Sequence, residues 1–498
     1  MVPALDLVLA VDIGTSSVRA MLFDAAGEVA ARSQRSYSTV RPAPYQEEQD
    51  PDVIRDETYR AMVDCLAQPG AAPARVGAIC FSSQLYGIIA LDAADRPLTR
   101  NIMWSDGRAE PQAEAMKAAG LQQRLYPVTG CPMNSIYPIA KIAWLRETSP
   151  EVFRQARRFV SIKDYIAAPL IGDWAVDHSM ASATGLFDIH RRRWHPEALA
   201  AVDVAENRLP RPVSGVEGFP LATGSPLAGR GLCDRVQVFL GGGDGPLANL
   251  GSGAAAPGAV NVDLGTSGAA RCTVASPMVD AAGSLWCYCL NEDLWTLGGI
   301  LTNVGNAYQW LGTNVVGVAD SACDVYAVMN RLAADIAPGA GGLFFLPYLR
   351  KVRSPYWDGR LKGVVYGLTA DHNVGHMARA MLESIAFDLR SIIALMRRES
   401  AVADRVVLTG GLARSPILPQ LLADVLGEEV FAPDNAEGSI AGAAILGLRG
   451  LGVIDGVDFV GKARPGRSFA PQPSTREGYD NAYHGYVRLV EALRQIAL

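Results

Sequence analysis

The chain has 498 residues, too many for one ordinary hydrophobic core, and therefore favours two large domains. Hydrophobic residues make up 49% of it and charged residues 19%, which is the composition of a globular protein. The formal net charge of -6 argues against a general attraction to nucleic acid or to an anionic membrane. The sequence contains no secretory signal and no apolar run near the roughly 20 residues that span a bilayer. We therefore expect a cytoplasmic protein without nucleic-acid or membrane partners.

A short pattern near the N-terminus returns half a chain later. Residues 7–23 contain an apolar run that ends in aspartate, a Gly-Thr-Ser turn and a second apolar run that carries arginine, and this pattern predicts a β-hairpin. Residues 259–271 repeat it. A repeat at this distance indicates two similar domains, each opened by the same hairpin. Because residues 251–258 form an uncharged, glycine-rich stretch, we place the domains at residues 1–253 and 254–498.

Strands and helices alternate along the rest of the chain. Apolar runs at residues 76–81 and 236–240 predict buried strands, and the segment at 87–92 predicts a further strand. The clearest helix is predicted at residues 376–398, which contain neither proline nor glycine. This alternation predicts α/β layers.

The two Gly-Thr-Ser turns are candidate phosphate-binding loops. Tight turns present backbone N–H groups, glycine permits close approach, and the hydroxyls add further donors. One copy alone would be a plain hairpin turn, but two copies with matching aspartates favour a polyphosphate held between two domains. The predicted residues in these segments are Asp12, Gly14, Thr15, Ser16, Arg19, Gly265 and Thr266.

Two aspartates are candidates for the chemistry itself. Asp12 ends a buried strand beside the first turn, where it is placed to hold Mg²⁺ through water. Asp244 follows a strand in a glycine-rich loop, where its carboxylate is placed to accept a proton from an attacking hydroxyl. Phosphoryl transfer needs positioning, a metal and one base, so few residues suffice. The alternative for Asp244 is a helix cap ahead of Pro246, and spacing alone leaves both interpretations open.

Two later segments begin helices next to glycines. Residues 406–416 predict a strand, a glycine turn and a helix capped by Ser415 with proline in its first turn. Gly410 and Gly411 leave a flat surface against which a nucleotide base can stack, although a plain β–α turn is the alternative. Residues 438–444 predict a helix start with small residues suited to close packing, and we expect its role to be structural.

Together these segments resemble the FGGY carbohydrate kinases, members of the wider group that contains actin, hexokinase and the heat-shock chaperone ATPases. The similarity runs from Leu7 to about Gly447. It implies two ribonuclease-H-like α/β domains around a central cleft, in which ATP, Mg²⁺ and a sugar meet. The implied enzyme is a phosphotransferase with an alcohol group as acceptor. A non-catalytic nucleotide switch of the actin or chaperone type is the alternative from another class.

The resemblance also implies roles for single residues. Asp244 would deprotonate the sugar hydroxyl and, with Asp12, position Mg²⁺. Gly410, Gly411 and Ser415 would line the nucleoside pocket. The segment at 305–310 resembles the helix start that meets the distal phosphates. It adds Gly305 and Gln309 to the phosphate site.

The substrate is predicted less directly. The resemblance places the dipeptide that contacts the sugar at Leu85-Tyr86. Xylulose and gluconate kinases usually carry Met-His there, and glycerol kinases carry Arg-Glu. This departure disfavours glycerol as the substrate. Residues 178–185 and 244–251 are similar to gluconokinases, which makes gluconate the expected substrate and a ketopentose such as xylulose the alternative. The predicted substrate-binding residues are Gln84, Leu85, Tyr86, Trp104, Tyr137 and Asp244.

One segment departs from the family pattern. Residues 344–349 fit it, but the Gly-Glu-Arg expected next is replaced by Lys351-Val352-Arg353. The sequence alone assigns no consequence to this change. It also leaves the oligomeric state open, with a homodimer as one option.

Overall fold

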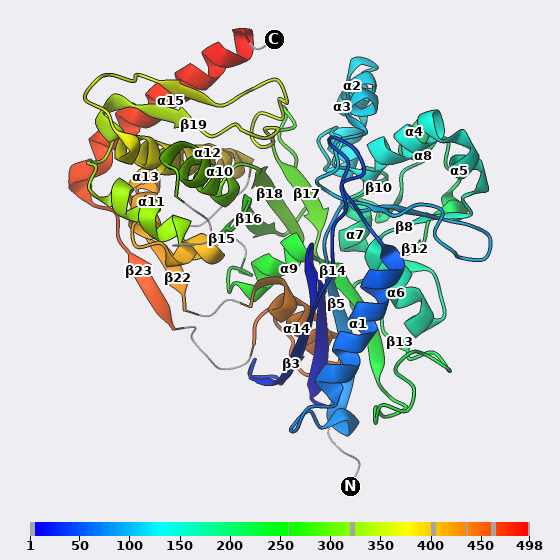
Figure 1. The fold of residues 1–498 in the computed structure, drawn as a ribbon. Coiled ribbons are helices and arrows are strands. Elements are labelled where there is room, and N and C mark those ends of the chain that lie inside the picture. Colours follow the sequence, from blue (N-terminus) through cyan, green and yellow to red (C-terminus); the bar gives the residue numbers. More distant parts are fainter. Residues whose placement is uncertain are drawn as a thin grey trace.

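The computed structural model describes residues 5–256, 258–318, 324–399, 405–434, 437–459 and 465–496. These residues form two α/β halves, each built on a large sheet (Figure 1). Among the described residues, no helix is both long enough and apolar enough to cross a membrane.

The N-terminal sheet begins with the predicted three-strand meander. Its strands are β1 (Leu7–Ile13), β2 (Ser17–Phe23), β3 (Val29–Ser36), β5 (Val76–Ser83), β13 (Phe219–Pro220) and β14 (Gln237–Gly243). Their order is β13-β14-β5-β1-β2-β3, with β1 antiparallel to β2 and parallel to β5. Every residue of β1 is buried, because alternate side chains such as Leu9 and Val8 enter different cores on the two faces.

The C-terminal sheet repeats this topology. Its strands are β15 (Val260–Leu264), β16 (Gly268–Val274), β17 (Trp286–Cys289), β18 (Trp295–Leu301), β21 (Val406–Thr409), β22 (Val430–Pro433) and β23 (Gly466–Phe469). Their order is β17-β18-β16-β15-β21-β22-β23. Strand β15 is antiparallel to β16 and parallel to β21, as β1 is to β2 and β5. The predicted second hairpin therefore occupies the same place in its sheet as the first.

Helices cover both faces of the N-terminal sheet. Helices α1 (Pro51–Leu66) and α6 (Ile162–Ile171) lie on one face, and α9 (Asp244–Gly251) and α14 (Gly438–Gly450) lie on the other. Helix α14 comes from the C-terminal part of the sequence, yet it packs beside α9 on β1 and β5 (Figure 1). The segment at 438–444, predicted to suit close packing, thus packs a C-terminal part of the sequence against the N-terminal sheet.

The C-terminal sheet is covered by α12 (Val374–Glu399), which packs on β16 and β18 and contains the helix predicted at 376–398. Around α12 lie α11 (Val325–Ala334), α13 (Leu418–Leu426) and α15 (Arg476–Ile496). Helix α10 (Gly305–Trp310) follows β18, and β19 (Phe344–Leu346) pairs with β20 (Val364–Tyr366).

Shorter elements complete the N-terminal half. The helices are α2 (Glu110–Ala118), α3 (Leu121–Thr129), α4 (Pro138–Thr148), α5 (Pro150–Gln155), α7 (His178–Ser182) and α8 (Pro196–Val202). The paired strands are β4 (Glu48–Gln49) with β7 (Asn101–Ile102), β6 (Ile89–Leu91) with β8 (Arg158–Val160), β9 (Ala175–Asp177) with β12 (Arg211–Val213), and β10 (Phe187–Asp188) with β11 (Arg193–Trp194). The strand predicted at 87–92 is confirmed only over β6.

The helix predicted directly after Ser415 begins later than expected. Residues 411–414 form a 3₁₀ turn, and α13 starts at Leu418. The Ser415 hydroxyl oxygen still accepts a hydrogen bond from the Leu418 N–H, at 3.3 Å. The difference arises because the chain leaves β21 through Gly410 at φ 88° and first makes the tighter turn.

Candidate active site

In the first Gly-Thr-Ser turn, hydrogen bonds within the protein occupy the carbonyl groups of Gly14 and Thr15. The Gly14 N–H donates to the Ser17 carbonyl at 3.0 Å, which closes the turn. The Gly14 carbonyl accepts from the Tyr37 hydroxyl at 2.6 Å, and the Thr15 carbonyl accepts from the Gln49 amide at 2.5 Å. Because these acceptors are occupied, the turn presents N–H groups and exposed hydroxyls, which suit an anionic phosphate. The exposed hydroxyls belong to Thr15 and Ser16.

The second turn has the same internal bond. The Gly265 N–H donates to the Ser267 carbonyl at 2.9 Å. Its acceptors are also occupied, because the N–H groups of Gly305 and Asn306 donate to the carbonyls of Gly265 and Thr266 at 3.1 and 3.0 Å. The start of α10 thus supports the turn. The direct contact of this helix start with the phosphates stays a prediction. Gln309 is exposed and lines neither the cavity around Asp244 nor the larger cavity beside the second turn.

Asp12 joins three elements through its carboxylate. One oxygen accepts from Arg19 of β2 at 2.7 Å. The other accepts from Ser82 of β5 at 2.7 Å and from Ser439 of α14 at 2.9 Å. The purely structural role expected for the start of α14 is therefore incomplete, since Ser439 contacts a predicted site residue.

Asp244 is the first residue of α9, and Gly243 occupies the cap position, so the alternative of a helix cap is not adopted. Its Oδ1 accepts from the Gly245 N–H at 2.7 Å. Burial raises the pKa of Asp244 to about 7, and the nearby Asp12 carboxylate raises it further, against the attraction of the Arg271 guanidinium. A carboxylate with this pKa is a stronger base than an ordinary aspartate.

A cavity of about 230 Å³ surrounds this carboxylate between the halves. It is lined by Arg19, Asp244, Gly245, Ala248, Asp263, Arg271, Thr409, Gly410, Glu437, Gly438 and Ser439. Asp263 and Arg271 belong to the repeated hairpin, and Asp263 Oδ2 lies 3.7 Å from Arg271 Nη1. The cavity therefore brings together both copies of the repeat, the start of α9 and the start of α14. We call it the carboxylate cavity.

A buried ion pair fixes the strand end that precedes Asp244. Lys163 of α6 pairs with Asp177, and both side chains are fully buried. Lys163 also donates to two carbonyls of β14, at 2.8 and 3.1 Å. The Gly243 N–H donates to the Ser179 hydroxyl at 3.2 Å. The sequence analysis did not predict the roles of Lys163, Asp177 and Ser179, because their contacts join segments that lie far apart in the chain.

The raised pKa of Asp244 predicts a pH-dependent cost to stability. The unfolded chain ionises this group near its ordinary pKa of 3.8, whereas the folded protein resists ionisation up to about 7. Stability is therefore lost as pH rises across this window, and Asp244→Asn removes the loss. Melting curves recorded with a chelator and without nucleotide are expected to show a Tm advantage of the variant that grows from pH 5 to 7 and then levels off. An advantage independent of pH would contradict the assignment.

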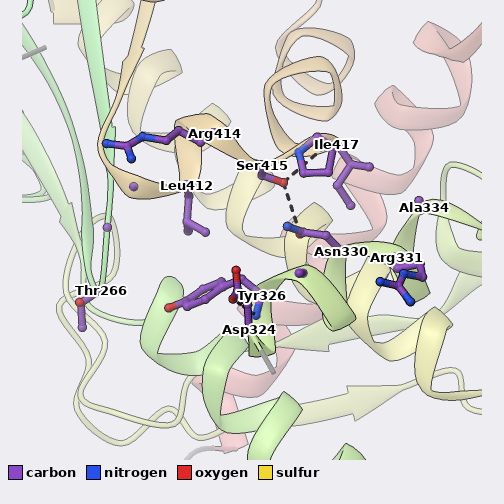
Figure 2. A pocket seen from close by; sticks show the side chains of 14 residues that line it. Thr266, Asp324, Tyr326, Asn330, Arg331, Ala334, Leu412, Arg414, Ser415 and Ile417 are labelled. Atoms are coloured by element: carbon purple, nitrogen blue, oxygen red, sulfur yellow. Dashed lines mark hydrogen bonds between the residues drawn. The ribbon is translucent and has the colours of Figure 1, made fainter. Parts of the chain in front are cut away.

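A larger cavity, of about 830 Å³, opens beside the second turn. Figure 2 shows Leu412 and Tyr326 pointing toward one another from opposite sides of it, and the Ser415 hydroxyl donating to the side-chain Oδ1 of Asn330 at 3.3 Å. An aromatic and an aliphatic side chain facing each other suit a planar base. Its lining comprises Gly265, Thr266, Asp324, Tyr326, Ala327, Asn330, Arg331, Ala334, Gly411, Leu412, Arg414, Ser415, Pro416 and Ile417. The residues of the α11 segment were not predicted.

Two adjacent glycines separate the cavities and provide a matched test. Gly410 has φ 88°, and a Cβ there would lie 2.4 Å from the Leu264 carbonyl oxygen and 2.6 Å from Asp263 Oδ1. A Cβ on Gly411 would meet nothing within 4 Å. Strain of about 1–3 kcal/mol predicts that Gly410→Ala lowers the free energy of unfolding by a similar amount, which thermal melts measure as a lower Tm. Gly411→Ala is the control for stability and is expected to leave the Tm near that of the wild type, since a Cβ there meets no protein atom; equal losses of Tm in both variants would contradict this account.

The predicted sugar-binding side chains form a wall near the first turn. Trp104 Nε1 donates to Thr15 Oγ1 at 3.2 Å. Leu85 is buried against Gly243, where a Cβ would lie only 2.2 Å from its Cδ2. Gln84 is buried and donates to the Gln49 side chain at 2.9 Å. None of these side chains lines the carboxylate cavity, and Leu85 instead supports the residues that precede Asp244.

Two further predicted residues meet a tyrosine of the other half. The hydroxyls of Tyr86 and Tyr137 lie 3.2 and 2.9 Å from the Tyr288 hydroxyl, which belongs to β17. Tyr86 and Tyr137 also contact each other edge to face, with ring centroids 5.4 Å apart. No sequence motif marks Tyr288, which is fully buried in its strand.

The carboxylates fit a hydrated divalent cation. Asp12 and Asp263 both raise the pKa of Asp244, so negative charge is in excess around the carboxylate cavity. Asp12 already accepts three hydrogen bonds, and its contact with a cation would run through water. In the described part of the chain no group of three or more metal-ligating side chains occurs. This set suits Mg²⁺, which keeps several waters and uses one or two carboxylates together with substrate phosphates.

Paired turns with N–H donors beside a base-sized cavity, together with a carboxylate of raised pKa between the halves, suit phosphoryl transfer. Family models described as the N-terminal and C-terminal domains of the FGGY family of carbohydrate kinases match residues 7–251 and 260–451. The chain belongs to the FGGY family of carbohydrate kinases. Kinases of this family use ATP as substrate and generally a divalent metal.

Relatives and solved structures agree with this family. The chain is 34% identical to a gluconokinase of Bacillus licheniformis over 91% of its own length and 89% of the relative's. It is similar to the crystal structure of a gluconate kinase from Lactobacillus acidophilus, with a TM-score of 0.91, 28% identity and 98% of each chain covered. A ligand-bound xylulose kinase from the same organism gives a TM-score of 0.92 at 27% identity, with 98% of each chain covered. The predicted pair of ribonuclease-H-like domains is confirmed.

Proposed function

We propose that this kinase transfers the γ-phosphate of ATP to a hydroxyl of gluconate, with Asp244 as the base and Mg²⁺ as the metal. The observation that carries the chemistry is a carboxylate whose pKa is raised to about 7, in a cavity between two donor turns. The substrate rests on the similarity to gluconokinases across nine-tenths of the chain.

In this mechanism the sugar hydroxyl hydrogen-bonds to the Asp244 carboxylate. As the hydroxyl oxygen attacks the γ-phosphorus, its proton moves to Asp244, the new O–P bond forms, and the bond to the leaving ADP oxygen breaks. The donors of the two turns hold the phosphates, and the large cavity holds the nucleoside. Arg271, which lines the carboxylate cavity beside Asp244, lies where negative charge accumulates on the transferring group.

A bound Mg²⁺ would neutralise part of the negative charge of the phosphates. Asp244 and Asp12 are the residues that would hold it, Asp12 through water. Arg19 keeps the Asp12 carboxylate oriented, since it donates to one of its oxygens at 2.7 Å. Removal of divalent metal is accordingly expected to abolish turnover.

A substrate panel followed by ADP release tests the proposal. With gluconate, D-xylulose and glycerol as acceptors, we expect kcat/KM for gluconate to exceed that for xylulose by about tenfold or more, an energy difference of about 1.4 kcal/mol. A preference for xylulose would establish the ketopentose alternative. ADP release with none of the acceptors would favour a nucleotide switch without catalysis.

A further inference from the structure

The segment that departs from the family pattern reaches across to the N-terminal half. Lys351 Nζ lies 2.8 Å from Glu110 Oε2, on α2. The guanidinium of Arg353 covers the Trp104 ring at 5.4 Å from its centroid. The segment is anchored in its own half, because the Asn303 amide donates to the Arg350 carbonyl at 3.0 Å. Both cations are thus held at the boundary between the halves.

The two cations differ in their partners. Lys351 is neutralised by Glu110, whereas Arg353 forms no ion pair with any carboxylate among the described residues. Its guanidinium donates to the Trp104 carbonyl, which lies 3.5 Å from Nη2. Val352, in the position where the resemblance places a glutamate, supplies no charge. A guanidinium has five N–H donors, and the desolvation cost of this half-buried one is offset only in part, by the Glu110 carboxylate that already pairs with Lys351.

Arg353 lies close to the predicted sugar-binding residues. Trp104, which it covers, donates to the first phosphate turn at Thr15. Lys141 Nζ donates to the carbonyls of Tyr86 and Met103, at 2.7 Å each, and so holds Tyr86 beside the residue that precedes Trp104. Leu85, the neighbour of Tyr86, lies against Gly243 and Gly245 on either side of Asp244, so this group of side chains connects the base with the Trp104 ring that Arg353 covers. An open-chain substrate with one end at Asp244 can extend along this tyrosine toward Arg353.

We propose that Arg353 binds the carboxylate of an open-chain sugar-acid substrate, while the hydroxyl to be phosphorylated lies at Asp244. Planar guanidinium and carboxylate groups form two parallel N–H···O bonds, and this pairing supplies the direct ion-pair partner that Arg353 does not have among the described residues. The inference rests on the proposed function and adds a residue that holds the acid end of its substrate.

Steady-state kinetics of Arg353→Gln test it with two substrates. Gluconate carries the carboxylate, and D-glucitol has a hydroxymethyl group in its place. Loss of a charge-assisted bidentate contact is expected to raise the KM for gluconate about 10–100-fold, with the KM for ATP changed less than about threefold. The ratio of kcat/KM for gluconate to that for glucitol is expected to fall by a similar factor. Arg353→Lys, which keeps the charge without the fork, is expected to lie between the wild type and the glutamine variant.

Arg350→Gln is the matched control, because it removes an exposed arginine of the same segment. It is expected to leave both KM values near those of the wild type. Unchanged gluconate KM in a folded Arg353→Gln protein, or equal losses with gluconate and glucitol, would overturn the inference while the proposed function stands. A wild-type enzyme that prefers neutral sugars would instead refute the proposed substrate. Melting curves identify a variant that has failed to fold, and the Arg353→Lys comparison then decides.

Discussion

The Asp244→Asn variant is expected to lose turnover by about 10²–10⁴-fold, the contribution of a positioned general base. Asparagine keeps the shape of the side chain and can still accept from the Gly245 N–H, but it cannot take the proton of the sugar hydroxyl. The large cavity does not include Asp244, so ATP affinity is expected to stay within about threefold of the wild type. Initial rates of ADP release and titration calorimetry with ATP measure the two quantities.

The matched control is Asp263→Asn. It removes the same charge from the same cavity but leaves the base in place. Its loss of turnover is therefore expected to be smaller, and the pKa of Asp244 is expected to fall because one neighbouring carboxylate is gone. Wild-type turnover in Asp244→Asn, or equal losses in the two variants, would contradict the role of Asp244 as the base.

The hairpins and the glycine turn could be predicted because their signals are local. The residues around Asp12 and Asp263 specify strand, turn and strand within about a dozen positions, and the structure places both hairpins at equivalent points of two sheets. The carboxylate of Asp244 was predicted from a glycine-rich loop after a buried strand, and the resemblance to the family then favoured a base over a helix cap. The division that we propose between residues 253 and 254 lies in the stretch that neither family match covers.

The missed residues depend on contacts that the sequence does not display. Ser439 reaches Asp12 across 427 positions of the chain, and Asn330 accepts from Ser415 across 85. Lys163 and Asp177 look like ordinary residues of a helix and a strand, although they are fully buried together. A polar side chain reveals its role in such cases only when the fold shows what surrounds it.

The packing of α14 on α9 leads to the second large prediction. Gly442 lies where a Cβ would come within 2.1 Å of the Leu247 carbonyl oxygen, a backbone atom of α9 that cannot move aside alone. Helix propensity by itself favours Gly→Ala by about 1 kcal/mol. Overpacking outweighs it here, and Gly442→Ala is expected to cost about 1–3 kcal/mol of stability.

Turnover is expected to fall in the same variant. Helix α9 carries Asp244, and α14 carries Ser439, which donates to Asp12. Forcing the two helices apart therefore changes the position of Asp244 relative to Asp12. Gly478 provides the control. It lies exposed in α15, and a Cβ there would meet nothing within 4 Å. Gly478→Ala should therefore raise the Tm and leave kcat unchanged. Thermal melts and ADP-release rates on both variants separate the two effects. A rise in Tm for both would mean that the close contact of α9 and α14 relaxes without cost, and that the position of Asp244 does not depend on it.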